Sequence, residues 1–358
     1  MNRLYRVLVL LSLLALPAVA QAAVAPDVVA SYAQSHGFSG TVVLQQPGKP
    51  LYRRSFGLAS RAFKQPNTPD TRYRIASITK AFTAVLVLQL VEQGKLDLQQ
   101  PIRRYLPGYA GNGGGKVTLH QLLNHTSGLP NFDQVKDLAT ALSEGVPNYQ
   151  KPRTSSQLMT DYCSGDLVAE PGKAFDYNNC DYIVLGKIVE AASGKPYAEL
   201  LRERIAVPLG LKHTGLLRQS DIVEGLADTY MYREDLKSLA NDLPVYAENW
   251  FAAGSLYSTA DDVLAFADGL FGGKLLSAAS LQAMTTPGLD DYGYGVWSYE
   301  MTIAGKKQRI VKRPGRIMGA QAQLFHMRDS GITLVLLANT DAVDLDEFAA
   351  EVARHSAD

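Results

Sequence analysis

The segment RIASITKAFTAVLVLQLVEQGKL, residues 74–96, places a serine and a lysine three positions apart at the start of a long apolar stretch. From Ala81 to Val91, apolar residues occur on every side of a helix with 3.6 residues per turn, which is typical of a helix buried all round. Gly94 is a suitable stop signal. The sequence therefore predicts a central core helix, with Ser77 and Lys80 on one face of its first turn.

Ser77 and Lys80 have the chemistry of a nucleophile and its base. A serine hydroxyl is a poor nucleophile until a neighbouring group removes its proton, and a lysine amine accepts a proton only when it is neutral. Burial disfavours the charged amine, and a helix N-terminus offers N–H groups to an oxyanion. In the alternative interpretation, Ser77 caps the helix and Lys80 is a solvated residue of its first turn.

A second candidate motif is FDYNNCDY, residues 175–182. A tyrosine close to the serine and lysine could relay a proton to a leaving group, and an asparagine amide could hold the lysine and a substrate carbonyl. Tyr177 and Asn179 are the candidates. The alternative is that Tyr177 is a half-buried core phenol and Asn179 a turn residue before the next helix.

The first residues have the pattern of a secretory signal. Arg3 and Arg6 precede an apolar run over 7–15, and small residues follow as far as Ala22. The run is shorter than the roughly 20 residues of a membrane-spanning helix, and no basic stop-transfer cluster follows it. We expect residues 1–22 to be a cleaved signal peptide rather than a membrane anchor, and the mature protein to be periplasmic or secreted.

The charge balance argues against a nucleic-acid partner. Lys plus Arg and Asp plus Glu both number 35, which leaves no basic excess to attract a polyanion.

No motif for a metal or a phosphate group is present in the sequence. The six histidines lack metal-binding spacings such as H-E-x-x-H, and the glycine run AGNGGGK at 110–116 departs from the phosphate-loop pattern, with Ala110 in place of the first glycine and Val117 in place of the final Ser or Thr. We expect no metal and no cofactor, and a small-molecule or peptidoglycan-derived peptide substrate.

Two cysteines, Cys163 and Cys180, leave two possibilities open. An exported protein in an oxidising compartment could pair them, and the bridge would contribute about 3 kcal/mol by closing a short loop. They could equally be two buried thiols.

Strand and helix patterns at the chain ends enclose a long helical middle. Helical patterns cover 27–34 and 344–355, and strand patterns cover 40–46, 51–57, 322–327 and 332–339. Between them, helical patterns alternate with loops rich in Gly, Pro, Asn and Ser. This order predicts a sheet domain from residues 23–70 and 290–358, an inserted helical domain from 71–289, and an active site at their interface.

Six segments occur in the order typical of one superfamily. They are RYRIASITKAFTA, LLNHTSGLP, FDYNNCDYIVLGKIVEAASGKPY, VPLGLKHTGL, AAGSLYSTADDVLAF and GITLVLLAN. Over nearly the whole mature chain, the sequence resembles the serine β-lactamase and penicillin-binding protein superfamily. The resemblance is greatest to its class C β-lactamase, D-alanyl-D-alanine carboxypeptidase and β-lactamase-like esterase branch.

The resemblance implies a fold and a set of roles. The fold would be α+β, an antiparallel sheet flanked by helices with an all-helical domain inserted. Ser77 would be the acylated nucleophile, Lys80 its activating partner, and Tyr177 with Asn179 the second motif. The oxyanion hole would combine the backbone N–H groups of Ser77 and Arg316.

The third family motif is altered here. Members usually carry Lys or His, then Ser or Thr, then Gly, whereas this chain has Arg313, Pro314 and Gly315. Arg313 could bind a substrate carboxylate through its planar fork, or be an exposed residue at a strand end. Pro314 removes a hydroxyl and a backbone donor, which argues against efficient penicillin recognition.

These observations predict an exported serine hydrolase that cleaves an amide or ester through a Ser77 acyl-enzyme. A D-alanyl peptidase or esterase fits better than an efficient β-lactamase. Because no G-x-S-x-G elbow is present, an α/β-hydrolase triad is disfavoured. The alternative is a non-catalytic module of penicillin-binding type that binds peptidoglycan fragments, although such a module has no need of Ser77, Lys80 and Tyr177 together.

Overall fold

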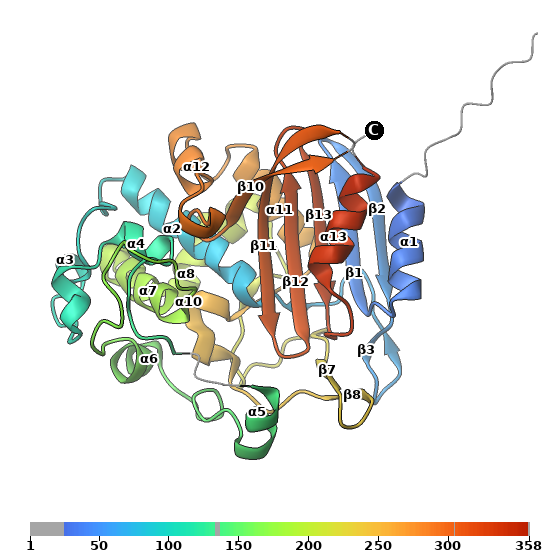
Figure 1. The fold of residues 1–358 in the computed structure, drawn as a ribbon, viewed down its shortest axis with the longest axis horizontal. Helices are drawn as coiled ribbons and strands as arrows, with labels where there is room; N and C mark the ends of the chain where they lie inside the picture. Colours follow the sequence, from blue (N-terminus) through green and yellow to red (C-terminus); the bar gives the residue numbers. More distant parts are fainter. Residues whose placement is uncertain (1–24, 133–136, 304, 357–358) are drawn as a thin grey trace, which may run out of the picture.

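A six-stranded antiparallel sheet, in the order β10-β11-β12-β13-β1-β2, joins the two ends of the chain (Figure 1). The computed structural model describes residues 25–132, 137–303 and 305–356, so the predicted signal peptide lies outside it. The strands are β1 (Gly40–Gln46), β2 (Lys49–Phe56), β10 (Trp297–Ile303), β11 (Lys306–Ile317), β12 (Ala320–Met327) and β13 (Ile332–Ala338). The strands predicted near both chain ends are confirmed, and β1 and β2 pair with each other.

Helices cover both faces of this sheet (Figure 1). Helices α1 (Ala25–Ser35) and α13 (Leu345–Arg354) pack on one face, and α11 (Ala260–Phe271) packs on the other. Side chains of successive strand residues point to opposite faces, so Leu324 belongs to the larger core and Phe325 to the smaller one beneath α13. The α+β class is confirmed.

The larger core is built around α2 (Thr79–Glu92), which is buried on all sides from Thr79 to Leu88. Helix α7 (Asn179–Ser193) and the short α10 (Phe251–Gly254) pack against it. Gly94 follows with φ +66°, which suits a glycine after a helix end. The prediction of a buried central helix is confirmed.

Short elements complete the helical side and its connections. The helices are α3 (Ile102–Tyr105), α4 (Leu119–Leu123), α5 (Leu138–Glu144), α6 (Ser155–Tyr162), α8 (Tyr197–Leu201), α9 (Val207–Leu209) and α12 (Ala278–Met284). The short strands are β3 (Leu58–Ser60), β4 (Gln65–Pro66), β5 (Tyr73–Arg74), β6 (Gly215–Leu216), β7 (Tyr230–Arg233), β8 (Ser238–Asn241) and β9 (Leu256–Ser258). No helix within the described ranges is long and apolar enough to span a bilayer. The division into two domains stays a prediction.

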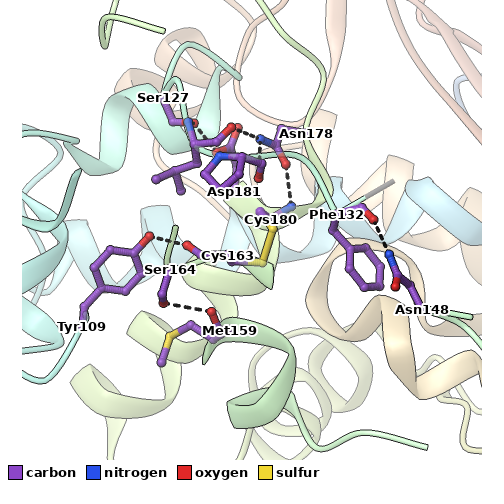
Figure 2. The surroundings of a disulfide bond; sticks show 12 residues. Tyr109, Ser127, Phe132, Asn148, Met159, Cys163, Ser164, Asn178, Cys180 and Asp181 are labelled. Carbon is purple, nitrogen blue, oxygen red and sulfur yellow. Dashed lines mark hydrogen bonds between the residues drawn. A yellow bond between two sulfur atoms is a disulfide. The ribbon is translucent and has the colours of Figure 1, made fainter. Parts of the chain in front are cut away.

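Cys163 and Cys180 form a disulfide, with their Cα atoms 5.1 Å apart (Figure 2). The bridge ties the residue that ends α6 to the first turn of α7. The Asn178 side chain caps that turn by accepting a hydrogen bond from the Cys180 N–H at 2.8 Å. The sequence allowed either a disulfide or two buried thiols, and the structure contains the disulfide.

Candidate active site

Ser77 lies in a 3₁₀ turn, η1 (Ala76–Ile78), that leads directly into α2. Ala76 adopts φ +45°, a strained conformation for a residue with a Cβ, and such strain is common at functional sites. Strand β11 passes close to this turn at Gly315. A Cβ on Gly315 would lie 2.5 Å from the Ile75 carbonyl oxygen and 3.0 Å from the Ser77 nitrogen, so only glycine permits this approach.

Lys80 is completely buried, and its amine is surrounded by acceptors. Its Nζ donates to Ser77 Oγ at 3.2 Å, to Asn179 Oδ1 at 2.6 Å and to the Ala253 carbonyl at 2.9 Å. Lys80 is therefore not a solvated residue of the first turn. Asn179 begins α7 and is itself buried, so it is not a simple turn residue.

Tyr177 completes the contact with the serine. Its hydroxyl donates to Ser77 Oγ at 2.8 Å, and Lys80 Nζ lies 4.7 Å from the centre of its ring. Burial raises the pKa of Tyr177, but the cations of Arg313 and Lys80 outweigh burial, and the net result is a pKa below the usual 10. The phenol of Tyr177 therefore loses its proton more easily than a phenol in water does.

Arg313 is 1% exposed, which rules out the interpretation as an exposed strand-end residue. Its Nε donates to the Ser77 carbonyl at 2.6 Å, and its Nη2 donates to the Tyr177 hydroxyl at 2.5 Å. Strand β10 begins at Trp297, opposite Lys312, so the stretch of β11 after Lys312 has no partner in β10 and lies against η1. Burial lowers the pKa of Arg313, but the neighbouring phenols outweigh it and the pKa is raised.

Sequence reasoning missed two aromatic residues that hold Arg313 in place. Tyr292 accepts a hydrogen bond from Nη1 at 3.0 Å, and the Trp297 ring lies 5.2 Å from the guanidinium carbon. Neither residue belongs to a recognisable motif: Tyr292 lies in the loop before β10 and Trp297 is the first residue of β10, and both reach the site through tertiary packing. No signal in the sequence would have found them.

His125, which the sequence analysis did not place in the site, packs against Tyr177 with ring centres 4.6 Å apart. It is buried and has φ +58°. Its Nδ1 lies 2.8 Å from Asp181 Oδ2. The Ser127 hydroxyl donates to the other carboxylate oxygen of Asp181 at 2.5 Å, and Figure 2 shows these two residues. Burial lowers the pKa of His125 and raises the pKa of Asp181. This group forms the wall behind Tyr177.

A cleft of about 510 Å³ opens onto Ser77. Tyr177, Arg313, Gly315 and Arg316 line it together with Ser77. The Arg316 side chain is largely exposed and pairs with Asp341 at 3.3 Å. Five of the seven predicted site residues therefore line one cleft. The other two, Lys80 and Asn179, are buried behind Ser77 and hydrogen-bonded to each other.

A serine hydroxyl contacted by a buried lysine and a phenol, at the junction of an antiparallel sheet and a buried helix, defines a serine hydrolase of the β-lactamase-related type. The comparison with known families agrees. The family model described as Beta-lactamase matches residues 25–358, and the chain belongs to that family. The resemblance expected from the sequence is confirmed.

Three known proteins show the range of this similarity. Penicillin-binding protein 4* of Bacillus subtilis is 29% identical over 334 residues, which cover 86% of this chain and 69% of that protein. The teichoic acid D-alanine hydrolase of Staphylococcus aureus is 28% identical over 281 residues, which cover 75% of this chain and 64% of that protein. The structure of a D-stereospecific amidohydrolase from Streptomyces sp. matches with a TM-score of 0.77 and 26% identity, covering 92% of this chain and 98% of that one.

Proposed function

We propose that this chain is an exported serine hydrolase that cleaves an ester or amide through an acyl-enzyme on Ser77. The observation that carries the proposal is the convergence of two groups on one hydroxyl: Tyr177 Oη lies 2.8 Å and Lys80 Nζ 3.2 Å from Ser77 Oγ. This is the geometry that nucleophilic catalysis requires of a base and its partner.

In the proposed reaction, the ionised Tyr177 takes the proton of Ser77 while Oγ attacks the substrate carbonyl carbon. Three acceptors around Lys80 Nζ favour its ammonium form, so Lys80 acts as a fixed cation beside the phenolate rather than as the neutral amine expected from the sequence. The N–H groups of Ser77 and Arg316 hold the oxyanion. Tyr177 then returns the proton to the departing alcohol or amine, and water hydrolyses the acyl-enzyme.

The orientation of Arg313 bears on the substrate. Three guanidinium nitrogens donate to groups of the protein, namely the Ser77 carbonyl and two phenols. A guanidinium held in this way is less free to bind a substrate carboxylate than one directed into the cleft. We therefore favour esters and amides of D-amino acids over penicillins and peptides with a free terminal carboxylate. The D-alanine hydrolase and D-stereospecific amidohydrolase among the similar proteins support this substrate class.

A hydrolysis screen tests the proposal. The substrates are nitrophenyl esters, D-alanine amide, a D-alanyl-D-alanine peptide and nitrocefin, each measured with the natural protein and with Ser77→Ala. We expect turnover of esters or amides that is lost in the variant, with slower turnover of the peptide and nitrocefin. Absence of turnover on all four, with ligands still bound, would favour a non-catalytic binding module. Fast nitrocefin hydrolysis would contradict the proposed role of Arg313.

A further inference from the structure

A second cavity, of about 640 Å³, shares no lining residue with the cleft at Ser77. Arg74, Asp228 and Asp242 bring opposite charges to its wall, and Gln150 and Asn241 add polar amides. It is formed around β5, the start of β7 and the segment after β8. In Figure 1, β7 and β8 lie below the turn that joins β11 to β12. We call this cavity the Arg74 pocket.

Arg74 has an unusual environment for a half-buried cation. Its side chain makes no hydrogen bond or ion pair with any residue in the described part of the chain, and its Nε is buried without a partner. Burial lowers the pKa of Arg74, while the more distant charges of Asp242 and Asp228 raise it. The donors of this guanidinium are therefore unused by the part of the protein that the structure describes.

Asp242, on the same wall of the Arg74 pocket, has an acceptor oxygen that the described residues leave without a well-formed hydrogen bond. Its Oδ1 accepts a hydrogen bond from the Gly319 N–H at 3.0 Å, and the nearby Thr229 side chain lowers the pKa of the carboxyl, whereas no well-formed hydrogen bond from a described residue reaches the buried Oδ2. Burial raises the pKa of Asp242. Arg74 and Asp242 form no direct ion pair within the described structure, so a donor and an acceptor of opposite charge line one cavity without meeting.

The balance of charge indicates what would fit between them. One guanidinium and two carboxylates give the pocket a net negative charge, so an anion alone would add to the excess. A cation alone would leave the donors of Arg74 unused. A ligand with both charges satisfies both sides, because buried charges are stable only when they are paired.

We propose that the Arg74 pocket binds the zwitterionic head of an amino acid, with the carboxylate on Arg74 and the ammonium group on Asp242 and Asp228. The pocket is connected to the two elements that form the candidate active site, η1 with Ser77 and β11 with Arg313. Arg74 lies three residues before Ser77, and Asp242 holds the turn at the end of β11. The binding itself does not depend on the proposed hydrolysis.

Calorimetric titration of the Ser77→Ala protein tests this site without turnover. The probes are D-alanine, D-alanine amide, which lacks the negative charge, and N-acetyl-D-alanine, which lacks the positive charge. We expect D-alanine to bind, and each single-charge analogue to bind about tenfold more weakly or worse. If all three bind equally, or D-alanine does not bind, the proposal is wrong.

Variants then locate the binding. On the Ser77→Ala background, Arg74→Gln and Asp242→Asn should each weaken D-alanine binding about tenfold or more. Arg316→Gln, which alters the cleft at Ser77, should leave it unchanged. The opposite pattern would place the amino acid in the cleft and overturn the proposal. Should either pocket variant fail to fold, the three-probe series on the unaltered pocket still decides.

Discussion

The guanidinium of Arg313 is a fixed positive charge beside the phenol of Tyr177, with Nη2 2.5 Å from the hydroxyl. Together with Lys80 it lowers the pKa of Tyr177, although burial alone would raise that pKa. Because the ionised phenol is the proposed base, the rate should rise as the pH passes upward through the pKa of Tyr177.

Replacing Arg313 by Met removes one of the two cations and so makes proton loss from Tyr177 harder. We expect the acidic limb of the kcat–pH profile to move to higher pH. Arg313→Lys, which keeps a charge without the planar fork, should move it less. The measurement is kcat on a nitrophenyl ester across pH. If the acidic limb of the kcat–pH profile stays at the same pH in Arg313→Met, Arg313 does not lower the pKa of Tyr177.

Gly315 controls how closely β11 approaches the nucleophile. In Gly315→Ala, the new methyl group would meet the Ile75 carbonyl at 2.5 Å, and β11 must move away from Ser77. We expect kcat/KM to fall by about tenfold or more and the free energy of unfolding to fall by about 1–3 kcal/mol. Gly108→Ala is the matched control, since a Cβ there contacts nothing within 4 Å. Equal activity in the two variants would argue against the proposed close approach.

At the scale of elements, the start of α7 carries several parts of the site at once. Asn179 contacts Lys80, Asp181 contacts His125, and the disulfide holds the same turn to the end of α6. The bridge therefore fixes the first turn of the helix that follows Tyr177.

Removal of this bridge in the double variant Cys163→Ala, Cys180→Ala should lower the free energy of unfolding by about 3 kcal/mol, because the unfolded chain regains the freedom of a 17-residue loop. Urea unfolding of the oxidised natural protein and of the variant measures this. The reduced natural protein should resemble the variant. A loss below about 1 kcal/mol would show that the bridge contributes little to stability.

At the scale of the whole molecule, His326 links the sheet to α11. It is buried, stacks on Phe271 with ring centres 3.8 Å apart, and pairs with the Thr333 hydroxyl at 2.9 Å. Burial, with a smaller effect of Arg328, lowers the pKa of His326 to about 4. The unfolded chain therefore takes up this proton at a higher pH than the folded protein does.

The sign of the stability change follows from this difference. Above the unfolded pKa of 6.5 neither state is charged at His326, and between 6.5 and about 4 only the unfolded state gains the proton. The stability should fall over this range, with His326 contributing about 3 kcal/mol of the loss. The difference in unfolding free energy between the natural protein and His326→Gln, followed from pH 7 to pH 4, isolates this residue. A constant difference would contradict the prediction.

The fold was predictable where one local pattern sufficed. The apolar run of α2, the strand patterns of β1, β12 and β13, and the amphipathic α13 are each read from adjacent residues. Several short elements were not predictable, because segments such as β5 and η1, just before α2, are held by distant partners rather than by their own sequence.

The candidate site divides in the same way. Ser77 and Lys80 share a helical turn, so their spacing predicts their contact. Arg313 was found by its place in the family order, but its inward direction depends on Tyr292 and on where β10 begins, which no local pattern marks. The sequence also gave no indication of the wall that His125 and Asp181 form behind Tyr177.

The mass of the intact protein after incubation with a fluorophosphonate shows whether Ser77 is the nucleophile. We expect a single covalent adduct that peptide mapping assigns to Ser77. We also expect slower labelling in Tyr177→Phe, because that variant lacks the proposed base. No adduct, or an adduct on a different residue that persists in Ser77→Ala, would contradict the role of Ser77 as the nucleophile.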